Sequence, residues 1–272
     1  MKKNAFQSFA AVPHSVWVVL FIAAPLLFVL AFAFRGADGS FSLANIAELS
    51  QYGNVFVLSI AFALIATVVC LLIGYPLAYF MSRQSPRAQR ILMVLVILPM
   101  WCNLLIRTYA LMALLDNGGL LNSLLEKIGL SKIPIVGTNF GVILGMVYDF
   151  LPYMVLPIYT CVSKIDKHMW EAASDLGCNT IQVITKVIFP LSMSGVISGV
   201  TMVLVPSIST FYISQKLGGG TFELIGDTIE RQFVTGAYNV GGAISLVMMI
   251  LILISIGVMN RFTEEDEGGI IV

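Results

Sequence analysis

Long apolar stretches separated by short polar ones dominate the pattern of this 272-residue chain. About 20 consecutive apolar residues suffice for one helical crossing of a bilayer, and six stretches reach that length. They are residues 15–34, 55–81, 91–115, 140–160, 187–213 and 240–259. Because lipid offers backbone N–H and C=O groups no partner, each crossing is predicted to be an α-helix. The pattern therefore predicts an all-α membrane protein with six transmembrane helices, forming a single domain over residues 1–272.

The composition supports a membrane protein and excludes few partners by charge alone. Hydrophobic residues make up 58% of the chain and charged residues 11%, with a mean hydropathy of +0.93. Soluble domains carry about a quarter charged residues. Basic and acidic residues are equal at 15 each, so net charge gives no indication of a nucleic-acid partner. The informative property is where the charges lie along the chain.

The distribution of Lys and Arg predicts the orientation. Nine of these 15 residues fall in the two termini and in the polar segments 82–90 and 161–186, which alternate with the other loops. Five fall in the remaining loops, and Arg107 lies inside a predicted span. Cytoplasmic loops are enriched in Lys and Arg, so both termini and segment 161–186 are predicted to be cytoplasmic.

Segment 164–190 interrupts the apolar pattern and predicts a helix, a turn and a second helix. Asp166 is placed to cap the first helix, and Gly177 suits the left-handed residue that ends it. Asn179, with Gln182 three residues later, is typical of the cap of a second helix that runs toward Pro190. In the first helix Ile165, Met169, Ala172, Ala173 and Leu176 share one face, while Lys167, Glu171 and Asp175 share another. A helix resting on lipid headgroups would have the same pattern.

The order of residues in this segment resembles a known motif. The residues are Glu171, Ala172, Ala173, Gly177, Val187, Phe189 and Pro190. They resemble the EAA loop in the inner-membrane permeases of ATP-binding-cassette importers, with Val187 and Phe189 where that family usually has Ile and Leu. The resemblance implies the type I importer permease fold, with a cytoplasmic coupling helix that docks in a groove of a separate ATPase subunit. It implies coupling roles for Glu171, Ala172, Ala173, Asp175 and Gly177.

Within this family, four longer stretches are similar to the permeases of spermidine/putrescine importers of the PotB type. The stretches are LIGYPLAYFMSR (72–83), LPMWCNLLIRTYALMALL (98–115), YDFLPYMVLPIYTCVSKIDKHMWEAASDLG (148–177) and FYISQKLGGG (211–220). The resemblance implies a bacterial inner-membrane complex with a second related permease, two ATPase subunits and an extracytoplasmic polyamine-binding protein. Related permeases carry iron, phosphonates, sulfate or thiamine, so another small solute is an open alternative. A transporter independent of ATP is a further alternative, but it leaves the EAA-like loop unexplained.

The chain has no motif for nucleotide chemistry or metal binding. It contains no G-x-x-x-x-G-K-[ST] sequence, the loop that holds nucleotide phosphates. We therefore expect this subunit to be no enzyme and to bind no cofactor, while a partner ATPase uses ATP and Mg. His14 and His168 each lack a second potential ligand nearby, so no metal site is expected.

Two charged residues lie well inside predicted spans, Arg107 in the third and Asp149 in the fourth. Such residues are costly in a membrane and indicate function or pairing. Both fall in the outer half of the bilayer, close enough in depth for the long Arg side chain to reach the carboxylate. One interpretation is therefore an intramembrane ion pair.

The second interpretation is that Asp149 lines the passage for a cationic polyamine. Aromatic side chains bind ammonium groups through their ring faces. The candidate passage residues are Trp101, Tyr148, Asp149, Tyr153, Phe211 and Tyr212, drawn from three spans. We favour this interpretation for Asp149 because Pro152 and Pro157 are expected to kink the same helix. Two or three of the aromatic residues are expected to face the passage, and the others to pack or lie at the interface.

Overall fold

The computed structural model describes residues 5–36 and 39–268, and these residues are almost wholly helical. Within them the β structure amounts to one isolated bridge, between Arg35 and Phe41. In this described part of the chain, five helical stretches are long and apolar enough to cross a membrane, and a bent pair of helices makes a sixth if it counts as one span. The all-α membrane fold predicted from the sequence is therefore confirmed.

The described chain divides into two compact units. The first comprises residues 1–54 and 228–251, and the second comprises residues 55–227 and 252–272. The assignment of the whole chain to one permease domain stays a prediction.

In the first unit, an N-terminal helix packs against the start of the C-terminal helix. The N-terminal part consists of α1 (Ala5–Val18), the π-helical η1 (Val19–Ala23), α2 (Ala24–Ala33), α3 (Ala44–Ala47) and the 3₁₀ helix η2 (Glu48–Tyr52), and the C-terminal helix is α15 (Tyr238–Gly268). A Cβ atom on Gly242 would lie 2.8 Å from the Phe32 Cβ, so α2 and α15 approach closely at this glycine. The Phe32 and Tyr238 ring centroids are 5.8 Å apart, which extends the same contact.

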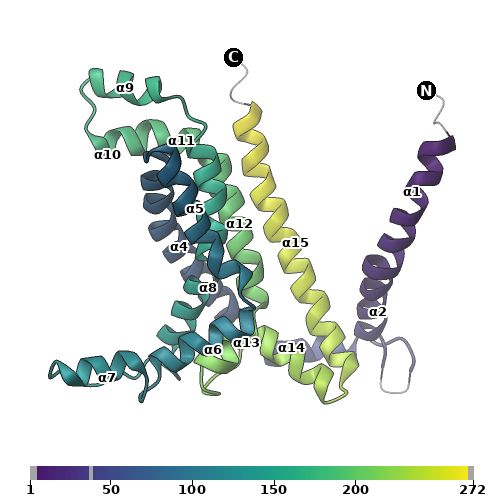
Figure 1. Cartoon of the computed structure of the whole chain (residues 1–272). Helices are drawn as coiled ribbons and strands as arrows, with labels where there is room; N and C mark the ends of the chain where they lie inside the picture. The colour runs from purple at the N-terminus through teal and green to yellow at the C-terminus, as the bar shows by residue number, and fades with distance from the viewer. Residues whose placement is uncertain (1–4, 37–38, 269–272) are drawn as a thin grey trace. The chain divides into compact units, whose positions relative to one another are not determined.

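The second unit is built around α8 (Asn139–Val162). Figure 1 shows α8 beside α4 (Gly53–Ser82), α5 (Pro86–Trp101) and α12 (Met193–Ser209). Gly195 and Gly199 are four residues apart and so lie on one face of α12, against α8. A Cβ at Gly199 would lie 2.9 Å from Met154 Sδ, and one at Gly195 would lie 2.8 Å from Cys161 Sγ. Small residues thus let the α8 and α12 backbones pack closely, as in other membrane helix pairs.

The third predicted span, residues 91–115, is wrong as a continuous helix. The chain forms α5, which ends at Trp101, and a separate α6 (Leu104–Leu115). Pro99 weakens the end of α5, and Asn103 starts α6 because its side chain accepts a 2.8 Å hydrogen bond from the Leu105 N–H. Figure 1 shows α6 and the following α7 (Leu120–Lys127) turning away from α5 across the end of this unit.

The fifth predicted span, residues 187–213, is also shorter in the structure. Helix α12 begins at Met193 and ends at Ser209. It is preceded by α10 (Thr180–Val183), the π-helical η3 (Ile184–Ile188) and α11 (Phe189–Leu191), which together are bent by 74° from α12. After α12 come α13 (Tyr212–Leu217) and α14 (Ile225–Val234). Phe211 and Tyr212 therefore lie beyond this span instead of inside it.

Candidate functional site

The segment between α8 and α12 begins with the short helix α9 (Lys167–Asp175). The Asp166 side chain accepts a 3.0 Å hydrogen bond from the His168 N–H, which satisfies one of the first amides of the helix. The predicted Asp166 cap is confirmed.

The turn after α9 also has the predicted chemistry. Gly177 has φ of +84°, the left-handed conformation that residues with a side chain rarely adopt. The Asn179 side chain accepts a 2.9 Å hydrogen bond from Gln182 N–H, and the Gln182 side chain accepts one of 2.9 Å from Asn179 N–H. This reciprocal capping box begins α10. The predicted order of helix, turn and helix is confirmed.

A tryptophan absent from the sequence interpretation anchors α9 to the rest of the second unit. Among the α9 side chains that the structure describes, Trp170 and Ala173 are the buried ones, at 6% and 7% exposed. The Trp170 ring stacks on Tyr79 with centroids 5.1 Å apart, and the Arg83 guanidinium carbon lies 4.2 Å from the Trp170 ring centroid. The spacing of Trp170 and Ala173, three residues apart on one helical face, is the signal that could have identified this contact.

The apolar face predicted for α9 is therefore divided by the structure. Ala173 faces its own chain, so it lacks the exposure that its predicted coupling role would need. Ala172 is exposed, as are Met169 at 47% and Leu176 at 85%. These three residues, of which Leu176 directly follows the helix, define the outer face of α9.

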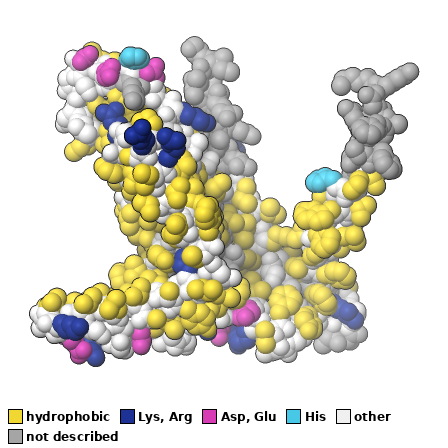
Figure 2. All heavy atoms as spheres, in the orientation of Figure 1, with side chains coloured by type: hydrophobic (Ala, Val, Ile, Leu, Met, Phe, Trp, Pro, Cys, Tyr) yellow, Lys and Arg dark blue, Asp and Glu magenta, His cyan; other side chains and the backbone are white. Residues whose placement is uncertain are grey.

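Charged side chains accompany this outer face. Glu171 and Asp175 are exposed, and Glu171 Oε2 lies 3.4 Å from His168 Nδ1. Figure 2 shows the second unit with charged side chains at the end that carries α9 and at the opposite end, and mostly hydrophobic side chains between. Such contacts between exposed side chains contribute little to stability, so Glu171 is available for another partner.

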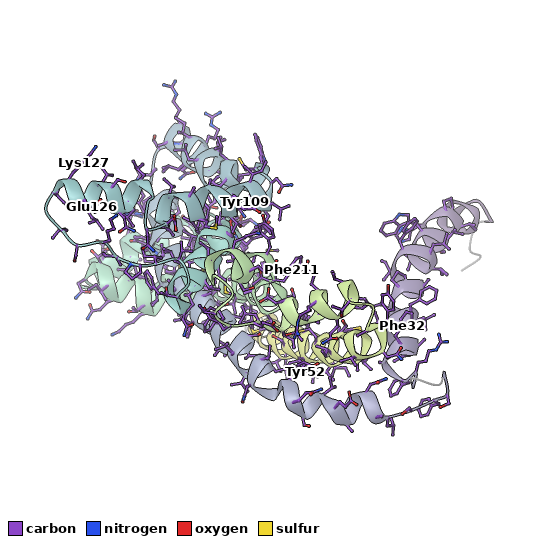
Figure 3. All side chains as sticks on the ribbon, turned by 90° about the horizontal axis from the view of Figure 1, so that it is seen from below. Phe32, Tyr52, Tyr109, Glu126, Lys127 and Phe211 are labelled. Atoms are coloured by element: carbon purple, nitrogen blue, oxygen red, sulfur yellow. The ribbon has the colours of Figure 1, made fainter. Side chains whose placement is uncertain are left out.

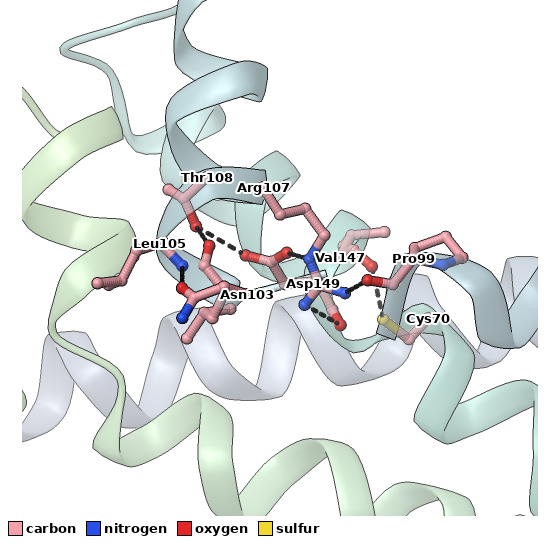
Figure 4. A network of polar contacts seen from close by, with 9 residues as sticks. Cys70, Pro99, Asn103, Leu105, Arg107, Thr108, Val147 and Asp149 are labelled. Carbon is pink, nitrogen blue, oxygen red and sulfur yellow. Dashed lines mark hydrogen bonds and ion pairs between the residues drawn. The ribbon is translucent and has the colours of Figure 1, made fainter. Parts of the chain in front are cut away.

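Arg107 and Asp149 form a buried ion pair in the second unit (Figure 4). Arg107 Nε contacts Asp149 Oδ1, and the two residues are 7% and 0% exposed. The second carboxylate oxygen, Oδ2, accepts a 3.2 Å hydrogen bond from the Thr108 hydroxyl. Both oxygens of Asp149 are thus occupied by groups of α6.

The same arginine joins the broken third span to α8. Its Nη1 donates a 3.0 Å hydrogen bond to the Pro99 carbonyl, and its Nη2 donates one of 3.3 Å to the Asp149 carbonyl. The Pro99 carbonyl is one of the last four of α5, and it also accepts a 3.2 Å hydrogen bond from the Cys102 N–H at the end of that helix. A positive charge at a helix C-terminus is also favourable. The structure therefore favours the ion-pair interpretation of Asp149 over contact with a passing cation.

The five aromatic candidates for the passage lie in different surroundings. Trp101 is 80% exposed at the end of α5, and Tyr148 is 41% exposed with its ring centroid 5.8 Å from the Arg107 guanidinium carbon. Tyr153 is half-buried, with its ring 6.3 Å from that of Phe150. A passage role for these three residues stays a prediction.

The other two aromatic candidates lie next to each other at the end of the unit opposite α9. Phe211 precedes α13 and is 40% exposed, and the Tyr212 ring meets that of Tyr109 edge to face at 5.8 Å. Figure 3 looks onto this end and labels Tyr109 on α6 and Phe211. Lys216 Nζ lies 5.1 Å and 5.6 Å from the Tyr109 and Tyr212 ring centroids. Tyr109 and Lys216 were not predicted from the sequence. The two tyrosine rings already contact the Lys216 ammonium group.

Among the described residues, no group of three or more His, Cys, Asp or Glu side chains is placed to hold a metal ion. The four cysteines, Cys70, Cys102, Cys161 and Cys178, are thiols without a disulfide bond.

The arrangement of helices and the segment between α8 and α12 agree with a match to a family model. The description of that family is binding-protein-dependent transport system inner membrane component, and the match covers residues 71–264. The chain belongs to this family. It is a permease subunit located in an inner membrane.

The permease is also similar to individual curated proteins over nearly its whole length. It is 38% identical over 269 residues to the spermidine/putrescine transport system permease protein PotB of Haemophilus influenzae, covering 95% of this chain and 94% of that protein. It is 37% identical over 246 residues to the protein of the same name from Escherichia coli, covering 86% and 90%.

Solved structures confirm the fold of the permease. A chain of a bacterial alginate ABC transporter, crystallised with a periplasmic protein bound to an alginate pentasaccharide, has a TM-score of 0.77 at 17% identity. That alignment covers 97% of this chain and 96% of the other. A chain of the MetNI methionine ABC transporter in an inward-facing conformation has a TM-score of 0.60 at 14% identity, covering 78% and 94%. The fold is that of the ABC importer type I permease.

Proposed function

We propose that this permease imports the polyamines spermidine and putrescine as part of an ATP-driven ABC importer. The observation that carries the proposal is the 38% identity to a spermidine/putrescine permease over 95% of the chain. At this similarity the two chains share the fold, and the relative's name supplies the solute. The structural neighbours are too distant in sequence to indicate a solute.

The proposed complex contains this permease, a second related permease, two ATPase subunits and an extracytoplasmic polyamine-binding protein. Closure of the ATPase pair on ATP and Mg moves the docked coupling helices. The two permeases then alternate between inward-facing and outward-facing states. ATP and solute shift the equilibrium between these two states. This chain contributes half of the passage and binds neither ATP nor metal itself.

The outer face of α9 is the proposed ATPase contact. Met169, Ala172 and Leu176 are exposed apolar residues on a helix at one end of the unit, and burying them against a groove would be favourable. Glu171 supplies a carboxylate for a basic group of the ATPase. A charge pair that is fully desolvated in an interface contributes more than one at its rim.

Spermidine uptake by the purified complex tests the proposed solute. We expect proteoliposomes containing the complex, its binding protein and internal ATP to accumulate labelled spermidine or putrescine. Controls are a complex without the binding protein and one whose ATPase cannot hydrolyse ATP, and neither should accumulate the solute. Uptake of iron, phosphonate or thiamine without uptake of either polyamine would show a different cargo.

The orientation is a second testable part of the proposal. Ser163 is exposed at the end that carries α9, and Ser131 is exposed in the loop after α7. In a chain with the four native cysteines replaced by Ser, we expect Ser163→Cys to react with a membrane-impermeant thiol reagent only after the cells are opened. Ser131→Cys, the matched control, should react in intact cells. The reverse result would contradict the cytoplasmic position of both termini.

A further inference from the structure

Trp170 lies where α9, in the segment between α8 and α12, contacts the membrane-spanning helix α4, which is distant in sequence. Tyr79 is in the last turn of α4, and Arg83 directly follows the end of that helix. Both contact the Trp170 ring, Tyr79 by stacking at an interplanar angle of 28° and Arg83 through its guanidinium at 4.2 Å from the centroid. We call Tyr79, Arg83 and Trp170 the α4–α9 clamp.

The clamp joins α9 to the end of α4. A cleft of about 480 Å³ lies beside it, lined by the turn between α4 and α5, the end of α8, and Trp170 with Glu171 of α9. Where this cleft opens, α9 does not pack on the α4–α5 turn. A displacement of α9 toward or away from the membrane therefore reaches α4 through the clamp.

The aromatic faces, and not a hydrogen bond, hold Trp170 in place. Its indole Nε1 is buried and has no hydrogen-bond partner. Stacked aromatic rings and a guanidinium above a ring are directional contacts that resist sliding and tilting. A phenylalanine would keep these faces and lose no hydrogen bond, whereas an aliphatic residue would fill part of the volume without them.

We propose that Trp170 is a positioning residue that transmits movement of the coupling helix to α4. This inference rests on the proposed function, because it assumes that an ATPase moves α9. It adds a path by which movement of α9 reaches α4, and the outer face of α9 does not provide such a path. Glu171 and the outer face of α9 are the proposed ATPase contact, while Trp170 is buried against its own chain and passes the displacement to α4.

Trp170→Leu should therefore uncouple ATP hydrolysis from transport. In proteoliposomes with the ATPase, second permease and binding protein, we expect Trp170→Leu to keep the amount of bound ATPase and most of the ATP hydrolysis. Spermidine uptake should fall about tenfold, which raises the ATP hydrolysed per spermidine by the same factor. Trp170→Phe should restore at least half of the uptake, and Arg83→Met should reproduce part of the loss.

The controls separate transmission from folding and docking. Tyr159→Phe removes a 3.3 Å hydrogen bond to Gln89 at the same end of the unit without touching the clamp, and it should transport normally. If Trp170→Leu lowers ATPase binding, or lowers hydrolysis and uptake in equal proportion, Trp170 serves docking or folding and the proposal is wrong. If Trp170→Leu does not assemble, Arg83→Met decides by the same two measurements.

The result also distinguishes this inference from the proposed function. A wild-type complex that takes up no polyamine contradicts the proposed function whatever Trp170 does. A wild-type complex that takes up spermidine, together with a Trp170→Leu variant of unchanged uptake per ATP, contradicts the transmission role alone.

Discussion

Asp149→Asn is expected to lower the yield of folded permease severely. The substitution removes the charge that Arg107 faces while leaving the guanidinium buried among α5, α6 and α8. Breaking a buried pair by removing one partner costs about 3–5 kcal/mol, because the remaining charge is uncompensated. This cost is a large part of the free energy of unfolding of a typical domain. The measurement is the amount of monodisperse complex recovered after detergent extraction.

A double variant tests whether the effect comes from the pair. Arg107→Gln removes the stranded charge, so Asp149→Asn with Arg107→Gln should recover part of the yield lost by Asp149→Asn alone. Thr108→Val is a matched control, since it removes the weaker partner of the same carboxylate and should cost about 1 kcal/mol. A normal yield for Asp149→Asn with reduced spermidine uptake would instead support contact with the cargo.

Gly177→Val is expected to abolish most transport while leaving the permease in the membrane. Gly177 has φ of +84°, which a β-branched residue cannot adopt without a strain of about 1–3 kcal/mol. The turn would rearrange and move the capping box of α10 away from the end of α9. We expect weak ATPase binding, measured by co-purification, and a corresponding loss of uptake.

Asparagine provides the matched control at this position, because it tolerates the left-handed conformation better than other residues with side chains. A Cβ atom at Gly177 would meet no atom within 4 Å, so steric exclusion plays no part and Gly177→Asn should retain most activity. Glu171→Ala should also weaken ATPase binding without affecting insertion. Full ATPase binding and transport in both Gly177→Val and Glu171→Ala would remove the basis for the docking role.

Local chemistry was predictable from the sequence where a few adjacent residues decide the structure. Asp166, Gly177, Asn179 and Gln182 each have the role that their type and spacing predict, because caps and turns depend on neighbours within four residues. The apolar runs likewise predict which stretches are long enough to cross the membrane. The limits of two spans were wrong, since an apolar run does not reveal where Asn103 starts a new helix or where the chain bends by 74° at Ser192.

Contacts between distant parts of the chain were less predictable. The predicted depths of the two residues in the bilayer indicated that Arg107 could reach Asp149. They could not show that Thr108 and the Pro99 carbonyl complete the network. Trp170 was missed because its partners are about 90 residues away, and a tryptophan beside charged residues has no periodic signal of its own. Contacts of this kind are decided by tertiary packing, which the pattern of a single sequence does not reveal.

The close packing of α8 and α12 has a mechanical consequence for the segment that joins them. Gly195 and Gly199 let the two backbones approach closely, so a side chain at either position would force α8 and α12 apart. The segment from α9 to α11 leaves the end of α8 and returns to the start of α12, so both of its attachments are on one stiff pair. Because both ends of the segment are attached to this pair, we expect a pull on the segment to move α8 and α12 together.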